Sequence, residues 1–304
     1  MGHHSHHPST PNANHYYVPH SSKWPIVGSI GLFFTAIGAA NFIQQSTDFV
    51  TTNTGSMGGL LLLVGLGTLI FMMIGWFSDT IRESLAGMNS QQLSTSYRMG
   101  MKWFIFSEVM FFAAFFGTLF YTRHLSIPWL SGAGAEAMTH EILWPDFQAM
   151  WPLVKTPDGR TLQAMSPWGL PLINTILLIA SSILVTIAHH ALLENKRGKV
   201  ITHLGIALIL GSAFMYVQGL EYYHAYTEMG LTLEAGIYGS TFFMLTGFHG
   251  LHVTIGAIML LIMWIRCLKG HFTPGNHFAF EAAAWYWHFV DVVWIFLFFV
   301  VYWL

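Results

Sequence analysis

Long, uninterrupted apolar runs separated by polar or turn-forming segments dominate this sequence. Each run is long enough to cross a bilayer, which takes about 20 mostly apolar residues. Because the apolar positions are continuous rather than alternating, the runs predict helices and not strands. The predicted spans are residues 24–43, 58–77, 99–121, 170–190, 200–220, 237–265 and 282–304. We therefore expect an all-α, polytopic protein with seven transmembrane helices in one membrane domain, residues 23–304, after a His-rich polar tail, residues 1–22.

Composition and charge exclude several other classes of protein. Hydrophobic residues make up 54% of the chain and charged residues only 9%, whereas a soluble domain carries roughly 25% charge. A net charge of −2 provides no basic field for nucleic acid, so no nucleic-acid partner is expected. Cys267 is the one cysteine, which excludes a disulfide framework and a site built on paired cysteines.

The distribution of basic residues predicts the orientation in the membrane. With the N-terminus inside, all but Arg123, Lys155 and Arg160 of the 12 Lys and Arg lie in inner segments, as the positive-inside rule requires. Those three share the long segment 122–168, and long loops escape the rule. We therefore expect a cytoplasmic N-terminus and a C-terminus on the opposite side. Glycines crowd the first two spans and permit close helix approach, which suggests two sub-bundles, a pair and a group of five.

Glu108 is the sharpest candidate for function, because it lies about 3 Å from the middle of the third predicted span at 1.5 Å per residue. A charge at that depth costs roughly 2.5–3.5 kcal/mol on insertion scales. One interpretation is a proton-relay or lipid-contact carboxyl. The other is a neutral carboxyl that forms a hydrogen bond with Ser107 or with a neighbouring helix.

The last two spans carry further polar residues at membrane depth. In the last span, these residues lie within about a third of the helix circumference at 100° per residue: Glu281, Trp285, His288 and Asp291. Such a stripe faces protein; it can carry protons, but more often it joins helices through hydrogen bonds. His249 and His252 stand at i, i+3 in the sixth span, where imidazoles suit either haem or copper. We favour packed or hydrogen-bonded histidines over a metal site.

Several blocks of this sequence resemble subunit III of the haem–copper cytochrome c oxidases. They are FSEVMFF (106–112), LPLINT (170–175) with AHH (188–190), YGSTFFMLTGFHG (238–250) and FEAAAWYWHFVDVVW (280–294). The resemblance runs from Trp24 to the C-terminus with the blocks in the same order. It implies seven helices, with a two-helix arm and a five-helix bundle around a lipid-filled, V-shaped cleft.

The resemblance also implies a role and partners. This subunit would be an accessory, metal-free part of a proton-pumping aa3-type oxidase (complex IV) that reduces oxygen to water. Haem and copper would lie in partner subunits I and II, and cytochrome c would bind the complex mainly elsewhere. Bound phospholipids would be its own ligands, and it would sustain proton uptake and the stability of subunit I. A bacterial inner membrane is the expected location, with the mitochondrial inner membrane as the alternative.

Individual positions carry over from the family pattern. Glu108 matches a third-helix carboxyl near the cleft, and Arg82, Glu83 and Arg266 match lipid-headgroup positions. The paired histidines that some relatives carry between helices two and three are missing in residues 86–92, so their roles do not transfer.

The sequence leaves three alternative functions open. The first is the same subunit in a quinol oxidase, where it often lacks the first two helices. The second is a transporter with Glu108 as its proton carrier. The third is a haem protein that uses His249 and His288.

Overall fold

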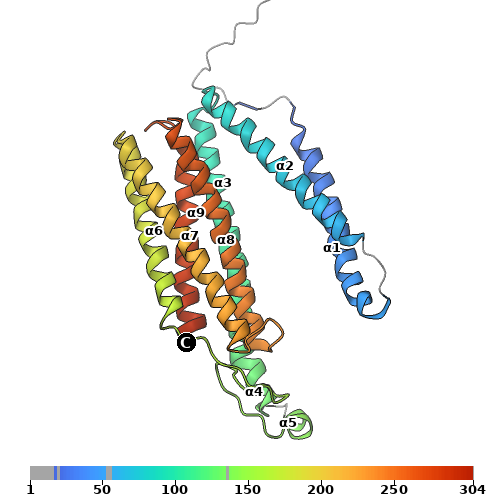
Figure 1. Ribbon diagram of the computed structural model, residues 1–304. Coiled ribbons are helices and arrows are strands. Elements are labelled where there is room, and N and C mark those ends of the chain that lie inside the picture. The colour runs from blue at the N-terminus through green and yellow to red at the C-terminus, as the bar shows by residue number, and fades with distance from the viewer. Residues whose placement is uncertain (1–16, 19–20, 53–56, 135–136, 304) are drawn as a thin grey trace, which may run out of the picture. The chain divides into compact units, whose positions relative to one another are not determined.

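The computed structural model of the protein describes residues 17–18, 21–52, 57–134 and 137–303, without the side chains of 45–52. Seven of the described helices are long and apolar enough to cross a membrane, which confirms the all-α, seven-span prediction (Figure 1). Their bounds are Trp24–Thr52 (α1), Gly58–Leu85 (α2), Gln91–Tyr121 (α3), Leu170–Leu193 (α6), Arg197–Thr227 (α7), Ile237–Leu268 (α8) and Phe278–Leu297 (α9). The predicted His-rich tail lies almost entirely outside the described residues.

Most helices are longer than the apolar runs that predict them. For example, α3 begins at Gln91 rather than at 99, and α7 continues to Thr227 rather than 220. The Ser90 hydroxyl accepts a hydrogen bond from the backbone N–H of Leu93 at 3.2 Å, which caps the start of α3. A hydropathy pattern detects only the part of a helix that needs apolar side chains, whereas the backbone ladder extends past it into the polar interface.

The chain divides into two compact units, residues 1–97 and 98–304. In the first unit, α1 and α2 pack against each other along their glycines. A Cβ atom at Gly38 would lie 2.3 Å from the backbone nitrogen of Leu62, and one at Gly65 would lie 2.4 Å from that of Thr35. Only glycine fits at these crossings, which confirms the predicted close approach of the first two spans. Large apolar side chains such as Phe33 and Leu63 are exposed on the other faces of this pair, where lipid would cover them.

The second unit holds the core of the protein. Helices α6, α7, α8 and α9 pack around the buried rings of Trp287, Trp294 and Phe214. Each indole N–H has a partner on α6: Trp287 donates to the Ser181 hydroxyl at 3.1 Å, and Trp294 donates to the Thr175 hydroxyl at 3.0 Å. Burying these aromatic rings removes large apolar area while every N–H keeps a hydrogen bond.

Helix α3 joins this core through long side chains rather than through close backbone contact. The Phe112 ring packs on Phe289 of α9 with centroids 6.2 Å apart, and Phe111 packs on Phe248 of α8 at 5.1 Å. Wide aromatic spacers of this kind place the α3 backbone at a distance from its neighbours. The polar contacts of α3 are therefore made by long side chains as well.

The segment 122–168 contains more structure than the predicted loop. A π-helical turn at Thr122–Ser126 (η1) continues α3 into Ile127–Leu130 (α4), and Ala137–Leu143 (α5) follows. A tight turn then pairs Lys155 with Thr161. The last helix also ends in a π-helical stretch, Phe298–Trp303 (η3).

Candidate functional site: polar residues in the membrane-spanning helices

Glu108 pairs with His252, a residue of another helix. Its carboxylate oxygen Oε2 lies 2.8 Å from His252 Nε2. Both side chains are largely buried, with 20% of Glu108 and 10% of His252 exposed. The Ser107 hydroxyl does not take part, because it donates to the backbone carbonyl of Phe104 at 2.6 Å. Of the partners considered from the sequence, the neighbouring helix is therefore the correct one.

The contact of the second ring nitrogen of His252 determines how many protons the Glu108–His252 pair holds. Nδ1 lies 2.6 Å from the backbone carbonyl of Phe248, and a carbonyl oxygen only accepts, so Nδ1 carries a hydrogen. One further proton therefore occupies the contact between Nε2 and Glu108. It resides either on the imidazole, as an ion pair, or on the carboxyl, as a neutral pair. Movement of this proton between Nε2 and Oε2 leaves the total charge of the pair unchanged.

Aromatic rings enclose the pair on the protein side. The His252 ring meets Phe112 edge-on at 5.0 Å and lies parallel to Tyr286 with centroids 6.5 Å apart. These rings exclude water from one side and lower the local dielectric, which strengthens the contact between Glu108 and His252.

The polar stripe of the last span divides between two neighbouring helices. Glu281 Oε2 accepts a hydrogen bond from Arg98 Nε on α3 at 2.9 Å and forms an ion pair with Nη2 of the same guanidinium, also at 2.9 Å. His288 contacts α6 instead, with Nδ1 at 2.7 Å from the Ser182 hydroxyl and Nε2 at 3.2 Å from that of Thr186. The stripe thus joins α9 to α3 at one end and to α6 further along.

The two remaining members of the stripe make fewer contacts. Trp285 is half-buried, and the structure records no hydrogen bond of its indole to a described residue. Asp291 is buried, and its Oδ1 has no partner within the described part of the chain. The interpretation of this stripe as a connection between helices rests on Glu281 and His288.

His249 and His252 contact different partners. Its Nε2 donates to the backbone carbonyl of Val290 on α9 at 3.1 Å, and its ring packs against Trp294 with centroids 5.0 Å apart. Among the described residues, no group of three or more His, Cys, Asp or Glu side chains is placed to hold a metal ion.

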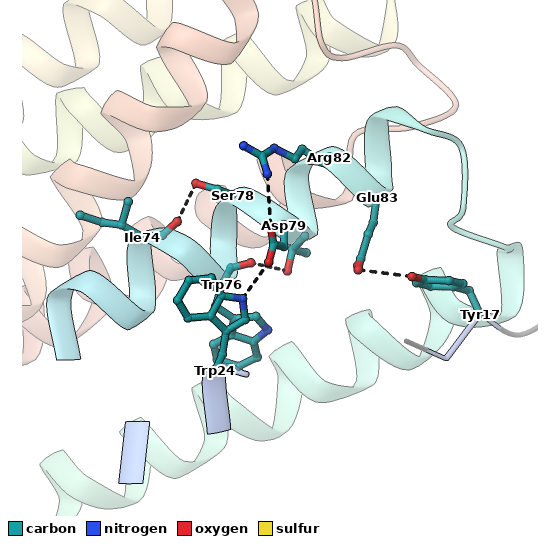
Figure 2. A network of polar contacts seen from close by, with 9 residues as sticks. Tyr17, Trp24, Ile74, Trp76, Ser78, Asp79, Arg82 and Glu83 are labelled. Carbon is teal, nitrogen blue, oxygen red and sulfur yellow. Dashed lines mark hydrogen bonds and ion pairs between the residues drawn. The ribbon is translucent and has the colours of Figure 1, made fainter. Parts of the chain in front are cut away.

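A second polar network lies in the first unit, where α1 begins and α2 ends (Figure 2). Asp79 accepts from the indole N–H of Trp24 at 2.8 Å and from the guanidinium of Arg82 at 3.4 Å. Glu83 accepts from the Tyr17 hydroxyl at 3.5 Å. Desolvation and the negative charge of Glu83 raise the pKa of Tyr17, so that this hydroxyl remains the donor. Arg82 contacts Asp79 through Nη1, and 80% of its side chain is exposed.

Arg266 differs from Arg82, although the family resemblance implies a lipid-headgroup position for both. It lies in the last turn of α8 and is only 6% exposed. Its guanidinium stacks over the Phe272 ring at 4.4 Å, and its Nε has no hydrogen-bond partner within the described residues. Burial under an aromatic ring restricts its access to any headgroup.

Sequence reasoning missed one ionisable residue in the spans. Glu221 is fully buried in α7, where its Oε1 accepts from the Tyr302 hydroxyl at 2.6 Å. The predicted fifth span ended at 220, one residue too early to include it. A helix-length criterion that extends α7 past the apolar run would have found it.

Comparison with known proteins agrees with this architecture. The family model of cytochrome c oxidase subunit III matches residues 14–304. The chain is 42% identical over 289 residues to cytochrome c oxidase subunit 3 of Marchantia polymorpha, which covers 95% of this chain and 96% of the relative. The subunit 3 of Latimeria chalumnae is 40% identical over 96% of this chain and 97% of its own. That of Arabidopsis thaliana is 39% identical over 95% and 96%.

Matches of this length agree with the seven spans, the pair α1–α2 and the all-helical body described above. The chain belongs to the cytochrome c oxidase subunit III family, a membrane subunit of the respiratory oxidase complex.

Proposed function

We propose that the chain is an accessory subunit of a proton-pumping aa3-type cytochrome c oxidase and carries no redox centre itself. Haem and copper would lie in subunits I and II, and this subunit would sustain proton uptake and the stability of subunit I. The supporting observation is that protein groups already engage the ring nitrogens of the candidate histidines. His252 and His288 each use both nitrogens, and His249 uses Nε2.

The Glu108–His252 pair supports the part of this proposal that concerns protons. The 2.8 Å contact between α3 and α8 has room for one shared proton, and the carboxyl keeps 20% of its side chain exposed. The pair could take up a proton at the exposed side of the Glu108 carboxyl and hold it between Glu108 and His252. Glu108 would therefore maintain the proton supply of the neighbouring catalytic subunit rather than act as a catalytic residue.

The presence of α1 and α2 favours the cytochrome c oxidase branch over a quinol oxidase. Both helices are long and apolar enough to span a membrane, whereas the quinol oxidase alternative often lacks them. The compared relatives also carry the name cytochrome c oxidase subunit 3. Cytochrome c itself would bind the complex mainly on other subunits.

Phospholipids are the proposed ligands of this chain. The exposed Arg82 guanidinium suits an anionic headgroup, with Glu83 beside it to accept from an ammonium or hydroxyl headgroup. Arg266 would take part only if its aromatic cover opens. This assignment places Arg82 and Arg266 at the inner boundary, with the N-terminus in the cytoplasm and the C-terminus in the periplasm. A bacterial inner membrane is the proposed location, and the mitochondrial inner membrane is the alternative.

Purification through this chain in mild detergent tests the assignment of the redox centres. A reduced-minus-oxidised spectrum and metal analysis are recorded before and after the chain is stripped from the complex. We expect haem and copper to co-purify and to remain with the partner subunits after stripping. Metal that stays with the isolated chain would contradict the proposal and make His249, His252 and His288 the ligands to test.

Substitution of one arginine tests the lipid assignment. Arg82→Ala should lower the number of anionic lipids that mass spectrometry counts in the purified complex. Arg160→Ala is the matched control, because Arg160 is also exposed and also pairs with a nearby aspartate, Asp158, at 2.9 Å. An equal lipid count in both variants and the parent would remove Arg82 from the lipid site.

A further inference from the structure

A buried polar cluster lies where α6 begins, α7 nears its end and η3 closes the chain. Its members are almost or fully inaccessible: Asn174 and Glu221 are 0% exposed, Gln218 is 4% and Tyr302 is 5%. No part of the proposed function uses these residues. Polar groups buried this deeply are costly unless each polar atom has a hydrogen-bond partner.

Two direct hydrogen bonds satisfy part of the cluster. The Asn174 side-chain Nδ2 donates to Gln218 Oε1 at 3.3 Å, which links α6 to α7. The Tyr302 hydroxyl donates to Glu221 Oε1 at 2.6 Å, which links η3 to α7. Gln218 and Glu221 stand at i, i+3, and side chains at this spacing are neighbours on one helix face.

Three atoms of the same cluster form no hydrogen bond of good geometry with a described residue: Asn174 Oδ1, Gln218 Nε2 and Glu221 Oε2. The Gln218 amide also interacts with the Tyr222 and Tyr302 hydroxyls, but its NH2 group has two N–H donors. In the Asn174 and Gln218 side-chain amides, one acceptor (Asn174 Oδ1) and one donor (Gln218 Nε2) are therefore unpaired. This result does not depend on how the amides are oriented, because exchanging O and N in both side chains again leaves one acceptor and one donor.

We expect Glu221 to carry a proton in this environment. The structure pairs it with no Lys, Arg or His among the described residues, and an isolated carboxylate in an apolar interior costs many kcal/mol. Because Oε1 accepts from Tyr302, the acid proton belongs on Oε2. The Oε2–H group is then a second donor that lacks an acceptor.

We propose that this cluster binds one ordered internal water molecule. The water would accept from Glu221 Oε2–H and from Gln218 Nε2–H, and it would donate to Asn174 Oδ1. These three hydrogen bonds satisfy every orphaned atom at once and match the usual coordination of a buried water. The site joins α6, α7 and η3, so the bound water helps hold the end of the chain to the helical body.

A density map of the intact oxidase complex at a resolution that shows waters tests the site directly. We expect a peak within about 2.5–3.2 Å of all three orphaned atoms. Infrared difference spectra should also show the carbonyl stretch of a protonated carboxylic acid that Glu221→Gln abolishes. Absence of the density peak, or direct pairing of the three atoms, would overturn the water site. A carboxylate band in place of the acid band would overturn the assigned hydrogen-bond directions.

Two variants separate the water from a general packing effect. Glu221→Gln keeps an acceptor for Tyr302 and an N–H donor for the water, so the density peak and the thermal unfolding midpoint should stay close to those of the parent. Glu221→Leu removes both functions, so we expect loss of the peak and a lower midpoint. Equal destabilisation by the two substitutions would contradict the proposed geometry.

Discussion

The contact between Glu108 on α3 and His252 on α8 can be measured by a double-mutant cycle. Glu108→Leu removes the carboxyl, and His252→Phe removes both ring nitrogens while it keeps an aromatic ring against Phe112. Each single variant leaves the other partner unsatisfied, whereas the double variant leaves neither. The non-additive part of the three free-energy changes is the energy of the contact.

The structure allows the size of this energy to be estimated. Hydrogen bonds between membrane helices average about 0.6 kcal/mol in such cycles, with a maximum of about 1.7 kcal/mol. The 2.8 Å contact is largely buried and charge-assisted in its ion-pair form, which roughly doubles the strength of a hydrogen bond. We therefore expect a coupling energy of about 1–2 kcal/mol, or about a 5- to 30-fold change in the unfolding equilibrium constant.

The assay is denaturing-detergent titration of the chain in mixed micelles, with the free energy of unfolding as the readout. Ser107→Ala combined with His252→Phe is the control, because the Ser107 hydroxyl bonds to its own helix and should show no coupling. A Glu108–His252 coupling energy below about 0.3–0.5 kcal/mol, the range expected for independent sites, would refute the pairing.

Glu108→Gln separates the structural role of this pair from its proton. The amide N–H can still donate to His252 Nε2, so we expect assembly and initial turnover of the oxidase to remain close to those of the parent. The amide carries no exchangeable acid proton, so the active lifetime during sustained turnover should shorten. Loss of assembly would instead show that the carboxyl is needed for the structure, and an unchanged lifetime would contradict its role in proton supply.

Three further substitutions test the packing of the two units. Gly38→Ala should weaken the α1–α2 pair by about 1–3 kcal/mol, as overpacking does, because its Cβ would meet backbone atoms of α2. Gly67→Ala is the control, because a Cβ at that position would lie in open space. Equal unfolding free energies of the two variants would disprove the close crossing. Arg98→Gln should destabilise the second unit in detergent titration, because it leaves the partly buried Glu281 carboxylate without its cation, and adding Glu281→Gln should restore part of the loss. Trp294→Phe keeps the ring but removes the bond to α6, so it should cost about 1 kcal/mol of unfolding free energy; a loss below about 0.3 kcal/mol would indicate that this bond is not formed.

The sequence by itself determined the number and kind of membrane helices. Each span is a local property, because about 20 consecutive apolar residues in lipid must satisfy their backbone groups within one helix. The close packing of α1 and α2 was also predictable from their glycines, since small residues are what permits backbones to approach. The position of Glu108 within the third span also followed from the third apolar run alone.

Helix ends and residues close to them were less predictable. Hydropathy marks the lipid-facing part of a helix and not its full length, so Glu221 fell just outside the predicted fifth span. The family resemblance implies a lipid-headgroup position for Arg266 in the last turn of α8, but it does not indicate how far the side chain is buried. The structure shows that its guanidinium stacks on the Phe272 ring.

Only the tertiary structure decided which polar groups meet. The pattern placed Glu281 and His288 on one stripe of α9, but their partners lie on different helices, Arg98 on α3 and Ser182 on α6. His252 lies 144 residues from Glu108, and His249, although only three residues from His252, contacts α9 instead. The physical reason is that a side chain's angle on its own helix follows from the 3.6-residue period, whereas its partner depends on how each neighbouring helix is rotated and shifted, and packing across the whole core sets those two quantities.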